Sequence, residues 1–453
     1  MSTTEVPTSD PSATNSYHSN NPAPAPAPNP AAAGGFLPLI VTQFFGAMND
    51  NVLKGVLTFM VIDGAWRGDL GRGGQGIVGI CFTLPFILLS GYAGQLADRY
   101  SKTGVAWWVK LFEIPIAIVA GIGFYTGQLW ITMTALVALT CQSSFFGPAK
   151  YGMIVELVGS EKLSKANGTI NMMTNLAVIL GTLVAGFVSD HYAPQDDAAI
   201  QPIPWLPAAV LITIAAAGFI AATRMPRLAA GRRDLPFDAN PFSTYVQTIG
   251  EMSQTRLLMI MMAWGYFYFL AGIALFILPE YTIVLDINRA NASVLMGVMG
   301  VAVGIGCAVA GLVSGNGIRP RLIPLGAAGL ILCFALLGWV TPKLGPGNGM
   351  ISVATSNVSL FILGAGFSAG FYIVPLQSLL QKLSPDNARG RYLGTANGVS
   401  FAFMTLSAIL YAAARGAFGN APQQMFLLCS LLMLSGTAFF LYRLKDQGIA
   451  DSV

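Results

Sequence analysis

The sequence predicts an all-α membrane protein with twelve transmembrane helices arranged as two six-helix bundles. Hydrophobic residues make up 54% of its 453 residues and charged residues only 10%, whereas soluble domains carry roughly 25% charged residues. Long apolar segments separated by short polar ones recur along most of the chain. One longer basic segment, 224–254, divides these apolar segments into six and six. A multi-pass membrane protein with two similar halves is therefore expected.

The two ends of the chain are polar. Residues 1–35 are rich in Ser, Thr, Asn, Pro and Ala. Because such a composition cannot bury enough apolar surface to fold, we expect a disordered cytoplasmic tail. The tail also lacks a basic stretch followed by an apolar stretch, so it does not look like a secretory signal. Residues 446–453 are expected to form a second, short cytoplasmic tail.

The apolar segments are long enough to cross a bilayer, since a helix rises about 1.5 Å per residue and the hydrocarbon core is roughly 30 Å thick. The predicted spans are 36–62, 75–97, 104–126, 129–156, 165–189, 203–223, 255–285, 291–315, 321–341, 351–381, 391–415 and 422–442. We expect an N-terminal bundle over 36–223, a cytoplasmic linker over 224–254 and a C-terminal bundle over 255–445.

Basic residues are distributed unequally between the two sides of the membrane. With a cytoplasmic N-terminus, sixteen Lys and Arg residues fall on the inner side and five on the outer side. Cytoplasmic loops carry an excess of Lys and Arg, so both termini are predicted to be cytoplasmic. The net charge of only +4 gives no support for nucleic-acid binding.

Short sequence patterns repeat between the two halves. Pro148 in the fourth span is followed by Ala-Asn-Gly at 166–168, and Pro375 in the tenth span by Ala-Asn-Gly at 396–398. The segment from Gly94 to Lys102 also has a degraded counterpart at 311–319. Two parallel six-helix repeats joined by a basic loop form the architecture of the major facilitator superfamily. Both prolines are expected to kink gating helices.

A polar face interrupts the first span. Gln43, Asp50, Asn51 and Lys54 are separated by seven, eight and eleven residues, which places them on one face of a helix. An ionisable residue at membrane depth costs several kcal/mol unless it is paired or faces a polar cavity, so this face predicts a substrate site. We expect Lys54 to be the resting partner of Asp50. Alternatively, an Asp50–Lys54 pair only holds helices together.

Polar groups in other spans are candidates for the same site. Lys150 could bind a substrate phosphate, or its side chain could reach the membrane interface. The amide side chains of Asn and Gln could bind a substrate or join helices. We expect Lys110 and Glu113, three residues apart in the third span, to form an ion pair with a structural role. The remaining candidate binding residues are Asn171, Asn175, Tyr268, Tyr372 and Gln377.

No pattern predicts a metal, a cofactor or an enzymatic reaction. The five cysteines lie in apolar segments without metal-ligand spacing, and the chain has only two histidines. A nucleotide-binding P-loop is missing, which argues against ATP hydrolysis by this chain. We therefore expect a transporter that is not an enzyme.

The loop after the second span resembles a motif of the major facilitator superfamily. It reads Gly94-Gln-Leu-Ala-Asp98-Arg99-Tyr-Ser-Lys102. The resemblance implies that Gly94 lets the second and eleventh helices pack closely. It also implies that Asp98, Arg99 and the further basic residue Lys102 form a latch on the cytoplasmic side. The motif says nothing about substrate.

Further blocks are similar to the bacterial lysophospholipid transporters. They are 36–51, 146–152, 163–168 and 370–377, in that order along the chain. The resemblance implies a monomer in the bacterial inner membrane that flips lysophosphatidylethanolamine-type lipids from the outer to the inner leaflet for re-acylation. Membrane lipids and a separate acyltransferase chain are the implied partners. Two alternatives remain open, a proton-coupled exporter of a soluble amphipathic compound and a non-transporting membrane scaffold or sensor.

The resemblance fails at one position in the seventh span. The enterobacterial members of this family carry a basic residue there, shortly after a Trp-Gly pair. Here Trp264-Gly265 is followed by Tyr266-Phe-Tyr268-Phe-Leu-Ala-Gly, without a cation. This departure leaves the binding of the lipid headgroup open.

Overall fold

A computed structural model describes residues 34–446, except for 63–65, 71–73, 194–200, 230, 232, 234, 236, 239, 286, 288, 340–349 and 420. Most of the predicted N-terminal tail and nearly all of the predicted C-terminal tail lie outside the described residues. Twelve long helices dominate the described chain. They are α1 (Phe36–Ile62), α3 (Gly74–Arg99), α4 (Lys102–Tyr125), α5 (Leu129–Val158), α6 (Leu163–Tyr192), α7 (Leu206–Thr223), α9 (Leu257–Ile277), α11 (Arg289–Ser314), α12 (Leu322–Trp339), α14 (Asn357–Leu383), α15 (Arg389–Arg415) and α16 (Met425–Asp446).

Eleven of these helices are long and apolar enough to cross a membrane. The twelfth, α1, is 27 residues long, and its central polar residues lower its mean hydropathy. All twelve correspond to predicted spans, which confirms the all-α fold class.

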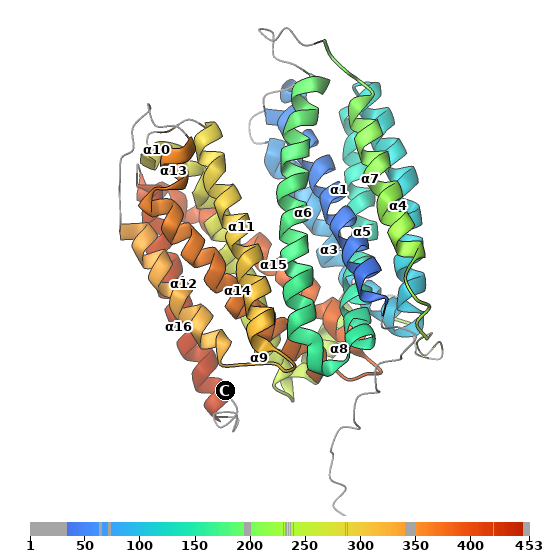
Figure 1. Cartoon of the computed structure of the whole chain (residues 1–453), viewed down its shortest axis with the longest axis vertical. Helices are drawn as coiled ribbons and strands as arrows, with labels where there is room; N and C mark the ends of the chain where they lie inside the picture. The colour runs from blue at the N-terminus through green and yellow to red at the C-terminus, as the bar shows by residue number, and fades with distance from the viewer. Residues whose placement is uncertain are drawn as a thin grey trace, which may run out of the picture.

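The long helices form two groups. In the first group, α1 packs against α6 and α7, and α5 packs against α3 and α4. In the second group, α14 packs against α11 and α12, while α9 packs against α15 and α16. Figure 1 shows the groups side by side, with α1 and α3 to α7 in one and α9 to α16 in the other.

The groups meet along two pairs of helices, α3 with α15 and α6 with α11. Glycine permits close backbone approach in both pairs. A Cβ atom added at Gly94 would lie 2.5 Å from the carbonyl oxygen of Gly390, and one added at Gly168 would lie 2.4 Å from that of Cys307. The ribbons of α6 and α11 approach each other near α8 and diverge toward the other end (Figure 1). The end that contains α8 is called the linker end below.

The segment predicted as a linker contains a helix, α8 (Pro241–Ser253). The Asn240 side chain caps it by accepting a hydrogen bond from the Phe242 amide at 3.0 Å. Hydrogen bonds from Ser243 and from the Asn240 amide hold the pKa of the Asp238 carboxyl below its ordinary value. The helix was not expected, because its alternating polar and apolar residues are too few to stand out from a linker.

Helix α8 contacts both groups of long helices. Gln95 of α3 donates to Thr244 at 2.7 Å, and the Tyr245 hydroxyl donates to the Ile87 carbonyl oxygen at 2.6 Å. Burial raises the pKa of Tyr245 to about 12. On the other group, Arg391 of α15 pairs with Glu251 at 2.5 Å. Helix α8 is therefore a folded connection between the two groups.

Two predicted spans are interrupted. The seventh, predicted over 255–285, ends as α9 at Ile277 and continues as a 3-10 turn (Leu278–Glu280) and a short helix, α10 (Tyr281–Leu285). Pro279 within this turn cannot donate a backbone hydrogen bond. The tenth, predicted over 351–381, is split into α13 (Met350–Ala354) and α14, where Ser356 caps the second helix. One further short helix, α2 (Arg67–Leu70), follows α1.

Candidate substrate site

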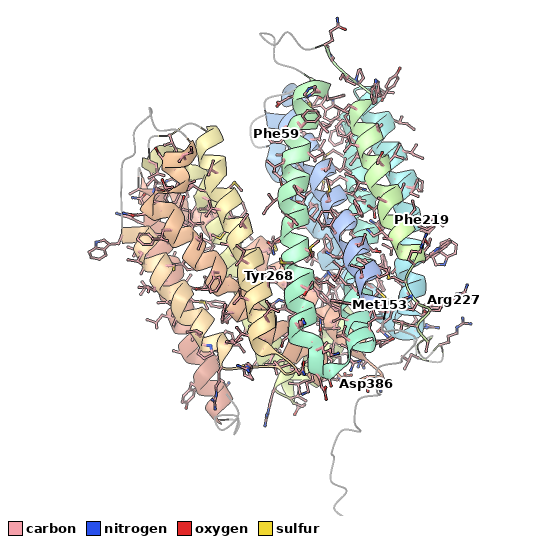
Figure 2. The ribbon with its side chains drawn as sticks, in the orientation of Figure 1. Phe59, Met153, Phe219, Arg227, Tyr268 and Asp386 are labelled. Atoms are coloured by element: carbon pink, nitrogen blue, oxygen red, sulfur yellow. The ribbon has the colours of Figure 1, made fainter. Side chains whose placement is uncertain are left out.

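A cavity of about 230 Å³, lined by apolar residues and a few charged and amide side chains, lies where the two groups of helices meet. Helices α1, α3, α5, α6, α9 and α15 all contribute to its wall. Tyr268 lies at mid-height of the molecule in Figure 2. Of the predicted binding residues, the cavity brings together Gln43, Asp50, Asn51, Lys150 and Tyr268.

Asp50 is the only carboxylate among the residues that line the cavity. Ser143 of α5 lies 3.1 Å from both of its carboxylate oxygens and donates its hydroxyl to them. Ser143 was missed in the sequence analysis, although it precedes Lys150 by two helical turns and so shares its face. The neighbouring Asn51 donates to the Ala47 carbonyl oxygen at 2.7 Å, and Gln43 donates to Thr174 of α6 at 3.1 Å.

Lys150 is the only cation among the lining residues. Its ammonium lies 4.4 Å from the ring centroid of Tyr151, and no carboxylate in the described part of the chain comes within 4 Å of it. The cavity therefore presents one carboxylate and one ammonium group that are not paired with each other.

Aromatic side chains form one part of the cavity wall, called the aromatic wall below. Trp264 lies edge-on to both Tyr151 and Tyr268, with ring centroids 6.1 Å apart in each case. Its side chain is buried, and its indole nitrogen has no hydrogen-bond partner among the described residues. On α9 this wall includes Trp264 and Tyr268, in the segment where the family resemblance implies a cation that this sequence lacks. Tyrosine and tryptophan faces attract cations, most strongly when water is excluded.

Lys54 does not contact Asp50 as expected. Its ammonium lies 4.7 Å from the ring centroid of Phe82 on α3, and Lys54 does not line the cavity. Lys54 is one helical turn beyond Asp50, where α3 covers α1. The other three residues of this predicted face line the cavity, but the cavity does not extend as far as Lys54.

Asn171 and Gln377 do not line the cavity either. Asn171 of α6 donates to Gln377 of α14 at 2.8 Å. One turn closer to the linker end, Asn167 donates to Ser378 at 3.0 Å and to Gln381 at 2.9 Å. These amides close the linker end by joining the two groups of helices. Asn175, which is also outside the cavity, donates to the Asn171 carbonyl oxygen at 2.9 Å.

Tyr372 is buried within the second group of helices, with an exposed fraction of 2%. Its ring stacks on Phe267 of α9, with centroids 5.9 Å apart. A glycine on α12, Gly326, packs directly against its backbone. Tyr372 therefore packs α14 against α9 and α12 and does not line the cavity.

A buried ion pair lies behind α1. Lys110 and Glu113 of α4 are 2.5 Å apart, and both side chains are at most 2% exposed. Asn49 of α1 donates to the same carboxylate at 2.8 Å. The expected structural role of this pair fits its position, because it joins α1 to α4 and does not line the cavity.

The predicted latch residues lie together at the linker end. Asp98 accepts hydrogen bonds from the amides of Gly390 at 2.6 Å and Arg391 at 2.8 Å, which lie in the first turn of α15, where backbone amides have no partner within the helix. Lys102 pairs with Glu156 at 2.6 Å, and Arg99 donates to the Arg233 carbonyl oxygen at 3.2 Å.

The two predicted gating prolines lie inside continuous helices. Pro148 is within α5 and Pro375 is within α14. Both are buried, and neither helix ends at its proline. A gating role for them stays a prediction.

We expect Gly168→Val to weaken the closed linker end, because the new side chain would collide with the Cys307 carbonyl oxygen and with Gly311. Cys307 is buried, so maleimide labelling of this thiol, located by mass spectrometry, should increase several-fold. Gly186→Val on the same helix is the matched control, since a Cβ there meets open space. Equal Cys307 labelling in both variants would contradict the expectation.

Comparison with known proteins places this architecture in a class of transporters. Residues 36–410 match the family model of the Major Facilitator Superfamily. Among solved structures, FucP in its outward conformation aligns with a TM-score of 0.67 at 11% identity, covering 90% of this chain and 99% of that one. A bacterial homologue of the iron transporter ferroportin, in an outward-facing state, aligns with a TM-score of 0.63 at 12% identity, covering 90% and 98%. The chain belongs to the Major Facilitator Superfamily.

Curated relatives identify the family within this class. The lysophospholipid transporter LplT of Photorhabdus laumondii is 30% identical over 364 residues, which cover 77% of this chain and 80% of the relative. LplT of Cronobacter sakazakii is 27% identical over 382 residues, which cover 81% and 83%. The chain is a multi-pass membrane protein of the LplT family.

Proposed function

We propose that this protein transports lysophospholipids with a zwitterionic headgroup, such as lysophosphatidylethanolamine, and has no enzymatic activity. The observation that carries the proposal is the cavity with one carboxylate, Asp50, and one ammonium, Lys150, which are not paired with each other. An ammonium of the headgroup would meet Asp50 and the aromatic wall, and its phosphate would meet Lys150. The names of the curated relatives support the same substrate class.

The size of the cavity supports a headgroup site. Pockets that enclose a drug-sized ligand measure roughly 300–1,000 Å³, and this one measures about 230 Å³. A headgroup and glycerol would occupy it, while the acyl chain extends between the groups of helices toward the bilayer. Because an unpaired charge in hydrocarbon is very costly, such a polar site would lower the barrier to crossing the membrane.

Transport would follow from alternating access of the two halves, 36–223 and 255–445. The excess of Lys and Arg on one side supports a cytoplasmic linker end and cytoplasmic termini. In this orientation the structure is closed toward the cytoplasm, by Asp98 at the start of α15 and by the amides of α6 and α14. We propose inward transport across the bacterial inner membrane, which would deliver the lipid to a separate acyltransferase.

The test is a translocation assay with the full chain in proteoliposomes. Labelled lysophosphatidylethanolamine or lysophosphatidylglycerol is added, and the fraction protected from extraction by albumin is measured over time. Faster protection of the zwitterionic lipid is expected, because Asp50 repels an anionic headgroup. If folded protein moves no lysophospholipid but shows proton flux driven by a soluble compound, the exporter alternative replaces this proposal.

Lys150→Gln is expected to slow protection of lysophosphatidylethanolamine at least about tenfold, because it removes a charged hydrogen bond to the phosphate. Lys162→Gln is the matched control, since Lys162 is exposed near the linker end. An unchanged rate in Lys150→Gln would mean that the phosphate binds elsewhere.

A further inference from the structure

We propose that a groove on the outer surface of the first helix group binds one anionic phospholipid of the cytoplasmic leaflet. Its acyl chain would lie in the groove, and its phosphate would contact Arg233. This ligand is not the transported lipid. Its assignment to the cytoplasmic leaflet rests on the orientation proposed above.

The groove is large and mainly apolar. It measures about 800 Å³ and is lined by residues of α3, α4 and α5. Trp108 and Phe112 on α4 leave 54% and 55% of their surfaces exposed, and Tyr100 leaves 44% exposed. These side chains face the surroundings of the bundle, which for a membrane protein are lipid. An acyl chain suits such a surface, because it adds no polar group that would need a partner there.

The length of the groove fits one leaflet. Its lining runs along α4 from Ser101 to Ile116, a rise of roughly 22 Å at 1.5 Å per residue. Half of a bilayer, headgroups included, is roughly 20–22 Å thick. The groove therefore extends from the headgroup level at the linker end to about the middle of the membrane. An acyl chain of one leaflet extends over the same distance.

A cation lies at the headgroup end. Arg233 lines the groove and is exposed. Its backbone is held in place, because Arg99 donates to its carbonyl oxygen at 3.2 Å and Gly231 packs against the backbone of Asp98. Further along the linker, the Ser101 hydroxyl donates to the Leu228 carbonyl oxygen at 2.9 Å.

These backbone contacts place Arg233 beside an apolar groove at the depth of the lipid phosphates. A guanidinium suits the geometry of a phosphate. The negative surface of the cytoplasmic leaflet further favours an anionic lipid at this position. Helix α5 separates the groove from the central cavity, since Gln142 lines the groove and Ser143 lines the cavity.

The experiment measures lipid retention by the full-length protein. Delipidated protein in detergent is incubated with palmitoyl-oleoyl phosphatidylglycerol, and bound lipid is counted by native mass spectrometry. We expect one retained molecule, and about fivefold weaker retention in Arg233→Gln because one phosphate contact is lost. Asp50→Asn should retain the lipid as wild type does, which separates this site from the transport site.

A matched pair of glycine variants tests the groove itself. Gly104 lines the groove, and a Cβ there makes only ordinary contacts, the nearest at 3.6 Å from the Ser101 Cβ. Gly104→Phe should fill the groove and abolish retention, while Gly186→Phe on α6, which meets open space, should not. A size-exclusion profile and melting temperature like those of wild type establish that each variant is folded. Equal retention in wild type and folded Gly104→Phe, or equal retention in wild type and Arg233→Gln, would overturn the proposal.

Discussion

Replacing Asp50 by asparagine is expected to reduce lysophosphatidylethanolamine translocation at least roughly thirtyfold, because losing the charged partner of a buried ammonium costs ~2 kcal/mol or more. The amide can still accept a hydrogen bond from Ser143, so the cavity should keep its shape. The initial rate of protection from albumin extraction, measured in proteoliposomes at matched protein density, reports the loss directly.

Two comparisons make the Asp50 result specific. Asp190→Asn removes an exposed carboxylate from the same helix group and should leave the rate unchanged. Lysophosphatidylglycerol, which has no ammonium, should lose its electrostatic repulsion in Asp50→Asn and be transported no more slowly than before. If both lipids slowed equally, Asp50 would act in the transport cycle and not in headgroup recognition.

The second large effect is expected on stability, at the ion pair between α1 and α4. Lys110→Met would leave Glu113 charged and buried with only the amide of Asn49 as a partner. Breaking a buried pair from one side costs roughly 3–5 kcal/mol. The melting temperature of the purified protein in detergent, followed by tryptophan fluorescence, should therefore fall by several degrees or more.

A double substitution provides the control for the ion pair. Lys110→Met with Glu113→Leu removes both charges and leaves no buried ion, so it should recover a large part of the lost stability. A double variant that melts as low as Lys110→Met would show that packing volume, and not charge, limits this site.

Hydropathy predicted the helices well because the membrane imposes their length and composition. All twelve spans are present, with most ends within a few residues of those predicted. Hydropathy did not predict the elements that lie outside the apolar spans or interrupt them. Helix α8 lies within the predicted linker and contacts both helix groups, whereas the break of the seventh span after Ile277 lies next to Pro279, a helix breaker that the sequence itself shows.

Helical periodicity predicted which way a polar residue faces but not how deep the cavity reaches. Gln43, Asp50 and Asn51 line the cavity, whereas Lys54 on the same face lies beyond its end. Asn171 and Gln377, which were predicted to bind substrate, join α6 to α14 in this structure, and a binding role for them stays a prediction. An amide can contact a lipid headgroup or another amide equally well, so the distinction requires the packing of distant helices.

The charge balance of the cavity has an energetic consequence for transport. With Asp50 and Lys150 both ionised, a zwitterionic lipid adds no net charge to the site. A membrane potential contributes about 2.3 kcal/mol per elementary charge for each 100 mV, and here that contribution cancels. If both groups keep their charges through the transport cycle, transport would be electroneutral, and its net direction would depend on how quickly the lipid is removed from the receiving leaflet.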